Sequence, residues 1–129
     1  MSSEAIKLTL PLTPISKKNS QQILINNRTG KPFIAPSQNY KIYERDCMYF
    51  LNRCTKPIDY PINLKCVFYM PTNRRCDLVN MLEAVCDVLV KAKVIEDDNY
   101  TIVAAHDGSR VEYDKNNPRT EITISRLSE

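Results

Sequence analysis

Glycine is scarce in this sequence, with only Gly30 and Gly108 among 129 residues. A loop that cradles phosphate groups with its backbone N–H groups needs several glycines close together. The sequence contains no such loop. This absence argues against a P-loop enzyme and against a dinucleotide-binding fold.

The sequence also lacks the cysteine and histidine spacing of a structural zinc site. Its five cysteines form no Cys-x-x-Cys pair, and a single histidine, His106, cannot complete a Cys/His ligand set. The number of cysteines is odd. We therefore expect free, buried thiols in a reducing compartment.

Long apolar runs are missing as well. The first residues, MSSEAIK, do not resemble a signal peptide, and no stretch approaches the roughly 20 apolar residues that a membrane helix needs. We therefore expect a cytoplasmic protein with no membrane partner. Its length, and its 43% hydrophobic and 26% charged residues, are typical of one globular domain covering residues 1–129.

The net charge of +3 makes the chain mildly basic, which permits nucleic-acid binding without demanding it. The position of the cations therefore carries more information than their sum. Several lie in predicted loops: Lys17, Lys18, Arg28, Lys31, Arg74, Arg75, Arg110 and Arg119.

Apolar periodicity and turn residues predict an α+β domain in which a mixed sheet packs with two main helices. Alternation and turn signals predict strands over residues 5–10, 23–25, 32–34, 62–70, 100–105 and 120–124, with 23–25 and 32–34 forming a hairpin. Helical spacing predicts one helix from the N-cap Ser37 to about Lys56 and another over residues 78–93.

Acidic residues gather around the second predicted helix and the turn that follows it. Asp77 stands at the start of the helix, and Asp107 closes the next strand. One helix face is expected to carry Asn80, Glu83, Asp87 and Lys91, and the opposite face Leu78, Leu82, Val85, Leu89 and Ala92. The turn contains Glu96, Asp97 and Asp98.

Clustered carboxylates suit the hydrolysis of a phosphodiester. That reaction needs an activated water and a stabilised leaving oxygen, and Mg²⁺ held by carboxylate oxygens supplies both. Neighbouring carboxylates repel each other by about 4 kcal/mol at 4 Å and an effective dielectric near 20, and a cation relieves this repulsion. Arg74 and Arg75, just before Asp77, are suited to grip phosphates.

Each of these residues also has a structural interpretation. Asp77 fits an N-cap, Asp87 and Lys91 fit an i,i+4 ion pair, and Asp97 and Asp98 fit a turn. Asp107-Gly108 is typical of a hairpin turn, and His106 of a structural histidine. Alone, the acid pattern gives only a weak indication of a metal site.

The segment RRCDLVNMLEAVCDVLVKAKVIEDDNYTIV resembles the signature of the RusA family of Holliday-junction resolvases. That signature has a basic pair, an Asp-Leu-x-Asn-Leu-like helix start, a later Asp-x-Leu, and Asp-Asp before a strand. The matching residues are Arg74, Arg75, Asp77, Leu78, Asn80, Leu82, Asp87, Leu89, Ala92, Asp97 and Asp98. The basic, Asn-containing loop over residues 14–20 also looks like the family.

The resemblance implies a RusA-like α+β homodimer, of a kind common in phages and prophages, that binds four-way DNA junctions. It implies symmetric cutting with Mg²⁺ or Mn²⁺ during recombination and repair. Carried over by position, Asp77 and Asp98 are the first candidate metal ligands, with Asp97 close behind. The expected phosphate contacts are Lys17, Lys18, Arg74, Arg75 and Arg110.

Two positions depart from the family pattern. Val79 stands where the best-known members carry a second aspartate, and Glu83 stands where they carry a lysine. We hypothesise that Glu83 replaces the missing carboxylate as a catalytic metal ligand. Two alternatives remain open: a catalytically degenerate protein that binds junctions without cutting, and an interaction protein whose acids only solvate a helix face.

Overall fold

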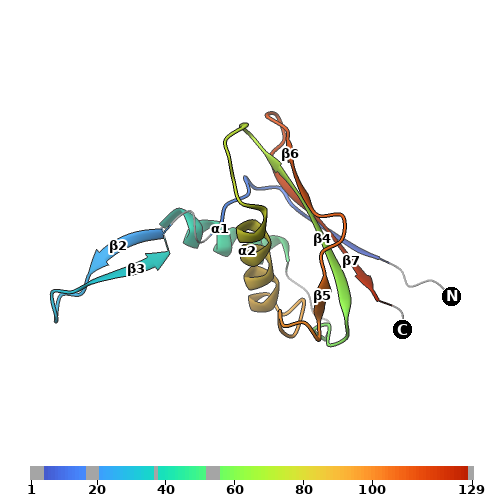
Figure 1. Cartoon of the computed structure of the whole chain (residues 1–129), viewed down its shortest axis with the longest axis horizontal. Coiled ribbons are helices and arrows are strands. Elements are labelled where there is room, and N and C mark those ends of the chain that lie inside the picture. The colour runs from blue at the N-terminus through green and yellow to red at the C-terminus, as the bar shows by residue number, and fades with distance from the viewer. Residues whose placement is uncertain (1–4, 17–20, 37, 52–55, 128–129) are drawn as a thin grey trace.

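The structure is a computed structural model that describes residues 5–16, 21–36, 38–51 and 56–127. A central sheet has two helices on one side, and a separate hairpin projects from the far end of the first helix (Figure 1). This arrangement confirms the predicted α+β class with a mixed sheet and two main helices.

The central sheet has the strand order β1-β7-β4-β5, and β6 also pairs with β4. Strand β4 runs antiparallel to β7, and β7 antiparallel to β1. Strands β5 and β6 run parallel to β4, so the sheet is mixed. The strands are β1 (Ile6–Leu10), β4 (Ile62–Met70), β5 (Val103–Ala105), β6 (Arg110–Tyr113) and β7 (Arg119–Arg126).

Strands β5 and β6 follow each other along the same edge of β4. Asn63 is in register with Ala105, and Val67 with Arg110. The hairpin interpretation of Asp107-Gly108 is therefore wrong: these residues interrupt one edge of the sheet, where Gly108 has a φ of +88°. Strand β6 is absent from the predicted strands, because its four residues are too few to show a clear apolar alternation.

The strand expected over residues 100–105 is shorter than predicted and covers only β5. Residues 100–102 form a turn, because the Asn99 side-chain oxygen accepts a hydrogen bond from Thr101 N at 3.0 Å. The Ile102 N–H and the Val103 N–H both donate to the Asn99 carbonyl. An Asx-type turn thus delays the start of the strand.

The two helices are α1 (Gln38–Phe50) and α2 (Leu78–Lys91). Helix α1 ends at Phe50, earlier than the predicted Lys56, and Leu51, which follows it, is only 1% exposed. Helix α2 ends where Lys93 adopts a left-handed φ of 61°. The expected N-cap Ser37 and residues 52–55 lie outside the described residues.

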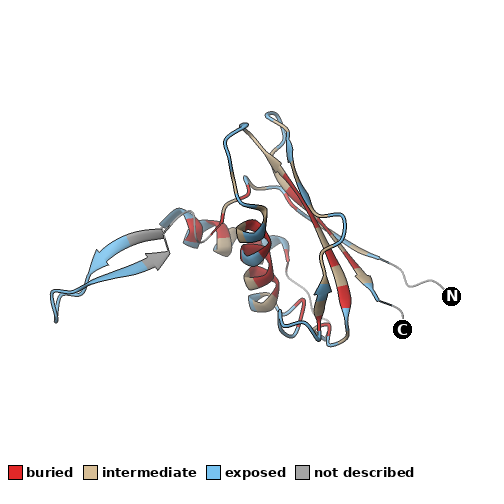
Figure 2. Ribbon diagram, viewed as in Figure 1, coloured by how far each residue is buried: buried red, intermediate tan, exposed pale blue. Residues whose placement is uncertain are grey.

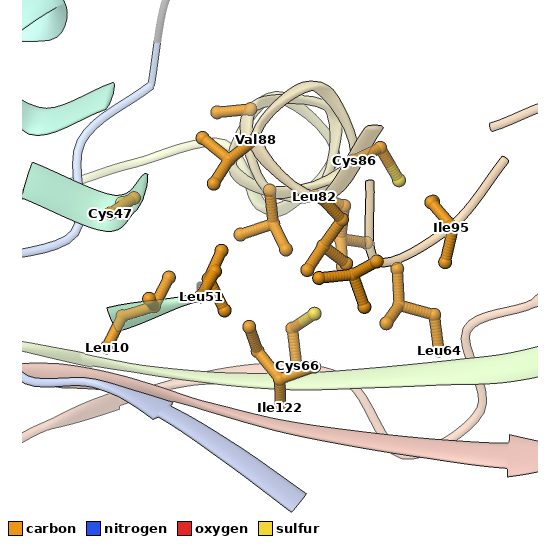
Figure 3. Packing of buried hydrophobic residues seen from close by; sticks show 14 of the residues in the cluster. Leu10, Cys47, Leu51, Leu64, Cys66, Leu82, Cys86, Val88, Ile95 and Ile122 are labelled. Atoms are coloured by element: carbon orange, nitrogen blue, oxygen red, sulfur yellow. The ribbon is translucent and has the colours of Figure 1, made fainter. Parts of the chain in front are cut away.

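The hydrophobic core lies between the two helices and the sheet (Figures 2 and 3). Leu82, Val85 and Leu89 of α2 are buried, as predicted for the face toward the sheet. They belong to the same buried cluster as Leu64 of β4 and Ile122 of β7. The packing fixes the rotation of α2, so its polar face points away from the sheet.

The described cysteines are free, as expected, and Cys54 lies outside the described residues. Burial raises the pKa of the Cys47 and Cys86 thiols to about 12, so both remain protonated and unreactive at neutral pH. Within the described residues, no helix has the length and apolar character required to cross a membrane.

Candidate functional site

A pocket of about 280 Å³ lies at the C-terminal end of α2. The turn after the helix forms one of its walls, and buried Val94 and Ile95 anchor that turn in the core. Its lining residues are Asp87, Val90, Lys91, Asp97 and Asp98, and we call this the acidic pocket. The structure thus brings Asp97 and Asp98 together with an acid one helical turn inside α2.

Asp97 holds the backbone of the turn in place. One of its carboxylate oxygens accepts a hydrogen bond from Asp98 N at 2.7 Å, and the other accepts one from the Asn99 side-chain amide at 3.0 Å. The turn interpretation of Asp97 is therefore confirmed. These bonds leave lone pairs on both oxygens, because each can accept more than one contact.

Asp98 carries the most perturbed carboxyl in the acidic pocket. Partial desolvation raises its pKa above the usual range, and so do a hydrogen bond to the Asp97 carboxyl and the charges of Asp97 and Asp87. The pocket therefore concentrates negative charge that a bound cation would stabilise.

Asp87 is the member of this group that the sequence analysis did not choose as a site residue. Its signal was present in two forms: it matches the Asp-x-Leu of the RusA signature, and it shares a helix face with Glu83. In the structure, the Lys91 ammonium contacts Glu44 of α1 at 2.7 Å, which ties the two helices together.

The acidic face extends from the pocket along α2 toward α1. Burial raises the pKa of the Tyr40 phenol, and the charges of Glu44, Asp87 and Glu83 raise it further. Glu83 itself is exposed near the middle of the helix. Glu83 therefore adds to the negative potential of this face, while it does not line the acidic pocket.

Asp77 lies at the opposite end of α2 from the acidic pocket. It is the helix N-cap, and its carboxylate accepts a hydrogen bond from Val79 N at 3.0 Å. From Asp77 to Asp87, the first helix residue that lines the acidic pocket, α2 rises by roughly 15 Å at the usual rise per residue. Within one chain, the two first candidate metal ligands, Asp77 and Asp98, therefore do not meet.

A groove of about 380 Å³ lies beside Asp77, and Arg74 and Arg75 line it. The other walls come from the segment after β1, the end of β4 with the segment after it, and α2: Thr13, Pro14, Ile15, Met70, Pro71, Thr72, Cys76 and Met81. We call this the arginine groove. The side chains of Lys17 and Lys18, also expected to contact phosphates, lie outside the described residues.

Arg110 occupies a different environment from the other candidate DNA contacts. Its guanidinium pairs with the Glu112 carboxylate and also donates to the Gly108 carbonyl at 3.4 Å. The hydrogen bond to Glu112 is the main reason that its pKa is raised. A phosphate would have to compete with Glu112 for this guanidinium.

His106 and Asp107 have structural partners on β4. The His106 Nδ1 atom lies 2.8 Å from the Leu64 carbonyl. Asp107 N donates to the Asn63 side chain at 2.7 Å, and Asn63 returns a hydrogen bond to the Asp107 carbonyl. These contacts confirm the structural interpretation of His106 and hold the interruption between β5 and β6 in place.

Among the described residues, no three His, Cys, Asp or Glu side chains stand close enough to form a complete metal site. The acidic pocket therefore offers an incomplete set of carboxylate ligands. Mg²⁺ tolerates such a set, because it is usually held by one or two carboxylates together with waters and substrate phosphates.

Comparison with known proteins connects this geometry to one family. Residues 11–125 match the family model described as "Endodeoxyribonuclease RusA". The chain is also 32% identical over 114 residues to the crossover junction endodeoxyribonuclease RusA of Aquifex aeolicus (strain VF5). That match covers 87% of this chain and 86% of the relative. The residues that match the family model include both the acidic pocket and the arginine groove.

Proposed function

The chain belongs to the RusA family of endodeoxyribonucleases, and we propose that it is a Mg²⁺-dependent endonuclease that resolves four-way DNA junctions by paired, symmetric nicks. The observation that carries this proposal is the acidic pocket, in which α2 and the turn after it bring Asp87, Asp97 and Asp98 together. Crossover junction cutting is the activity named for the Aquifex relative.

The donor chemistry of the acidic pocket fits Mg²⁺, with Mn²⁺ as the alternative ion. All of its ligating groups are carboxylate oxygens, which hard cations prefer. The pKa of Asp98 is raised first by partial burial and then by its acidic neighbours, and a bound cation would offset both effects on its anion. Asp97 and Asp98 would hold the ion, and Asp87 would add negative charge to the pocket. When bound, Mg²⁺ supplies activation of water and stabilisation of the leaving oxygen.

The residues around Asp77 are suited to position the DNA backbone. Arg74 and Arg75 line a groove, and guanidinium groups bind phosphate oxygens in a two-pronged geometry. Lys17 and Lys18 follow the groove residues Thr13 to Ile15 in the sequence and would extend the same contact. Arg110 would contribute only after releasing Glu112.

The distance between Asp77 and Asp98 favours a homodimer in which both subunits contribute to each site. The two aspartates lie at opposite ends of α2, so one ion can bind both only if they come from different copies. We therefore propose that Asp77 of one subunit completes the acidic pocket of the other. A two-fold dimer would then present two equal sites to the two strands of a symmetric junction.

The first experiment compares cleavage of a labelled four-way junction with cleavage of a linear duplex of the same sequence, with and without Mg²⁺. We expect paired nicks in the junction alone, dependent on Mg²⁺, and a loss of at least about 100-fold in Asp98→Asn and in Asp77→Asn. Asp107→Asn, which changes an exposed aspartate outside the pocket, serves as the control. Junction binding without any cutting in Mg²⁺ or Mn²⁺ would contradict the proposal.

Mixing the two inactive variants tests the shared site. If Asp77 and Asp98 act across the interface, a heterodimer of Asp77→Asn and Asp98→Asn has one intact site and one site with both changes. Nicking should then return on mixing, while symmetric double cutting should not. If each site belonged to one chain, both sites of the heterodimer would be damaged and the mixture would remain inactive.

Val79 favours a second candidate function, a junction-binding protein without nuclease activity. At this position the chain has an apolar side chain, 67% exposed, where the family pattern has an aspartate. Such a protein would still need the arginine groove but would not need divalent metal. The same cleavage experiment separates the two functions.

A further inference from the structure

The hairpin formed by β2 (Gln21–Ile25), β3 (Pro32–Pro36) and the turn between them stands apart from the rest of the molecule (Figure 1). We call residues 21–36 the arm. Its two strands pair only with each other among the described strands. None of its described side chains belongs to the hydrophobic core.

Both faces of the arm expose large apolar side chains (Figure 2). Ile23 is in register with Ile34, and these side chains are 74% and 67% exposed. On the other face Leu24 is opposite Phe33, at 38% and 45%. Ile25, 66% exposed, extends the first face.

An arm of this composition is not stable by itself in water. A lone two-stranded hairpin is marginal at best, and a contiguous exposed apolar surface marks a site of interaction. The turn of the arm is well ordered nonetheless, because the Asn26 side chain accepts a hydrogen bond from Arg28 N at 2.8 Å and Gly30 supplies a positive φ. The arm is therefore shaped to dock onto another surface.

The composition of the arm favours a protein surface over DNA as its partner. Its strands contain no lysine or arginine, and its only cations, Arg28 and Lys31, lie at the turn. A DNA-binding ribbon needs cations along its length to contact phosphates. Pro32 and Pro36, at the two ends of β3, remove N–H groups from that edge and disfavour the addition of another strand.

A matching receptor surface exists on the same chain. A groove of about 500 Å³ is lined by Leu12, Arg45, Asp46, Tyr49 and Phe50. Tyr49 is 82% exposed and stands edge-on to the Phe50 ring, with ring centroids 5.3 Å apart. We call this the α1 groove. Its apolar walls suit the isoleucines of the arm, while Arg45 and Asp46 on its polar side pair with each other at 3.1 Å.

The arm cannot fill the α1 groove of its own chain. The arm precedes α1, lies at the N-terminal end of that helix and points away from the helices and the sheet (Figure 1). The groove residues Arg45 to Phe50 lie in the C-terminal half of the helix. A second copy of the chain therefore offers the nearest surface of the right chemistry.

We propose that two copies exchange arms, so that the arm of each subunit lies in the α1 groove of the other. Each chain carries both the arm and its receptor, which is the self-complementary arrangement that a two-fold dimer requires. Every contact is made twice. This inference locates the interface of the dimer in the proposed function and does not depend on cleavage.

The test measures oligomeric state by analytical ultracentrifugation of the full chain, without DNA or metal. The arm variant is Ile23→Thr with Ile34→Thr, which keeps β-branched residues in the strands. The groove variant is Tyr49→Lys, at an exposed position. Tyr113→Thr, 51% exposed on β6, is the matched control. We expect the wild type and the control to form dimers with the same dissociation constant. The dimer dissociation constant of each test variant should be at least ~30-fold higher.

Mixing then distinguishes arm exchange from other losses of dimerisation. A heterodimer of the arm variant and the groove variant retains one intact arm and one intact groove, so mixing should restore dimers. A mixture that stays monomeric would overturn the exchange. A wild type that is monomeric would overturn the dimer itself.

Two further outcomes would also overturn the inference. An arm variant that remains dimeric places the interface elsewhere. An arm variant that remains dimeric and loses junction affinity assigns the arm to DNA. Junction cleavage is measured separately, so a failed interface and a failed nuclease assignment give different results.

Discussion

At the scale of single residues, the charge on Asp98 links the stability of the fold to metal binding. Its raised pKa means that the folded chain holds this proton more tightly than the unfolded chain does. Between the ordinary pKa of aspartate and the raised value, the native state therefore binds more protons, and stability falls as pH rises. At neutral pH, ionised Asp98 destabilises the metal-free protein.

We predict that Asp98→Asn raises the Tm of the metal-free protein at neutral pH. The difference from wild type should shrink as pH falls toward about 4, where aspartate is protonated in the unfolded chain too. Mg²⁺ should raise the Tm of wild type at neutral pH and have little effect on the variant. Thermal unfolding in EDTA and in Mg²⁺ across pH checks this, and a lower Tm for the variant in EDTA would contradict it.

Glu83 tests whether a carboxylate elsewhere on α2 replaces the one missing at Val79. We predict that Glu83→Ala lowers junction cleavage by about 10- to 100-fold, because it removes a metal ligand or its support. Glu96→Ala, which removes another exposed acid from the turn after α2, is the control. Normal cutting by Glu83→Ala would leave Glu83 with no catalytic role.

At the scale of elements, helix α2 carries candidate functional residues at both of its ends. Its N-terminus carries Asp77 beside the arginine groove, and its C-terminus leads into the acidic pocket. The apolar face packs into the core between them. A substitution at Asp77 therefore changes two things at once: the stability of α2 and the candidate ligand at its N-terminus.

The two roles of Asp77 can be separated by the choice of substitution. Asp77→Ala should reduce the free energy of unfolding by about 1 kcal/mol, because it removes the N-cap acceptor for Val79 N. Asp77→Asn should keep that stability, since asparagine caps as well as aspartate. Urea unfolding measures the first effect and junction cleavage the second. Equal losses of stability in both variants would argue against the cap.

At the scale of the whole molecule, the separation of cations and acids organises DNA binding. The arginine groove and the acidic pocket lie at opposite ends of one helix, so phosphates can bind at one end while the other remains free for metal. We predict that Arg74→Ala with Arg75→Ala reduces the slope of log affinity against log salt concentration by about 2.

The double variant should weaken binding to junctions of different sequence by similar factors, because phosphate contacts carry no sequence information. Fluorescence anisotropy over a range of salt concentrations measures the slope. Lys7→Ala with Lys115→Ala, at two exposed positions outside the groove, the pocket and the arm, is the charge-matched control. An unchanged slope for the groove variant would show that the groove does not hold the DNA backbone.

The sequence by itself determined most of the elements and the family. Apolar alternation located β1, β4 and the hairpin, and helical spacing identified the buried face of α2 through Leu82 and Leu89. The acid and arginine pattern around Asp77 was specific enough to indicate the RusA family, which the comparisons confirm. These features are local, so a periodicity or a motif records them.

Only the tertiary structure decided which acids share a pocket. The length of α2 separates Asp77 from Asp98, and the turn anchored by Ile95 brings Asp98 to Asp87. The tertiary structure also placed β6 on the edge of β4 and left the arm unpaired with any other strand in the described part of the chain. Such contacts join residues far apart in the sequence, and their geometry depends on how the helices pack against the sheet.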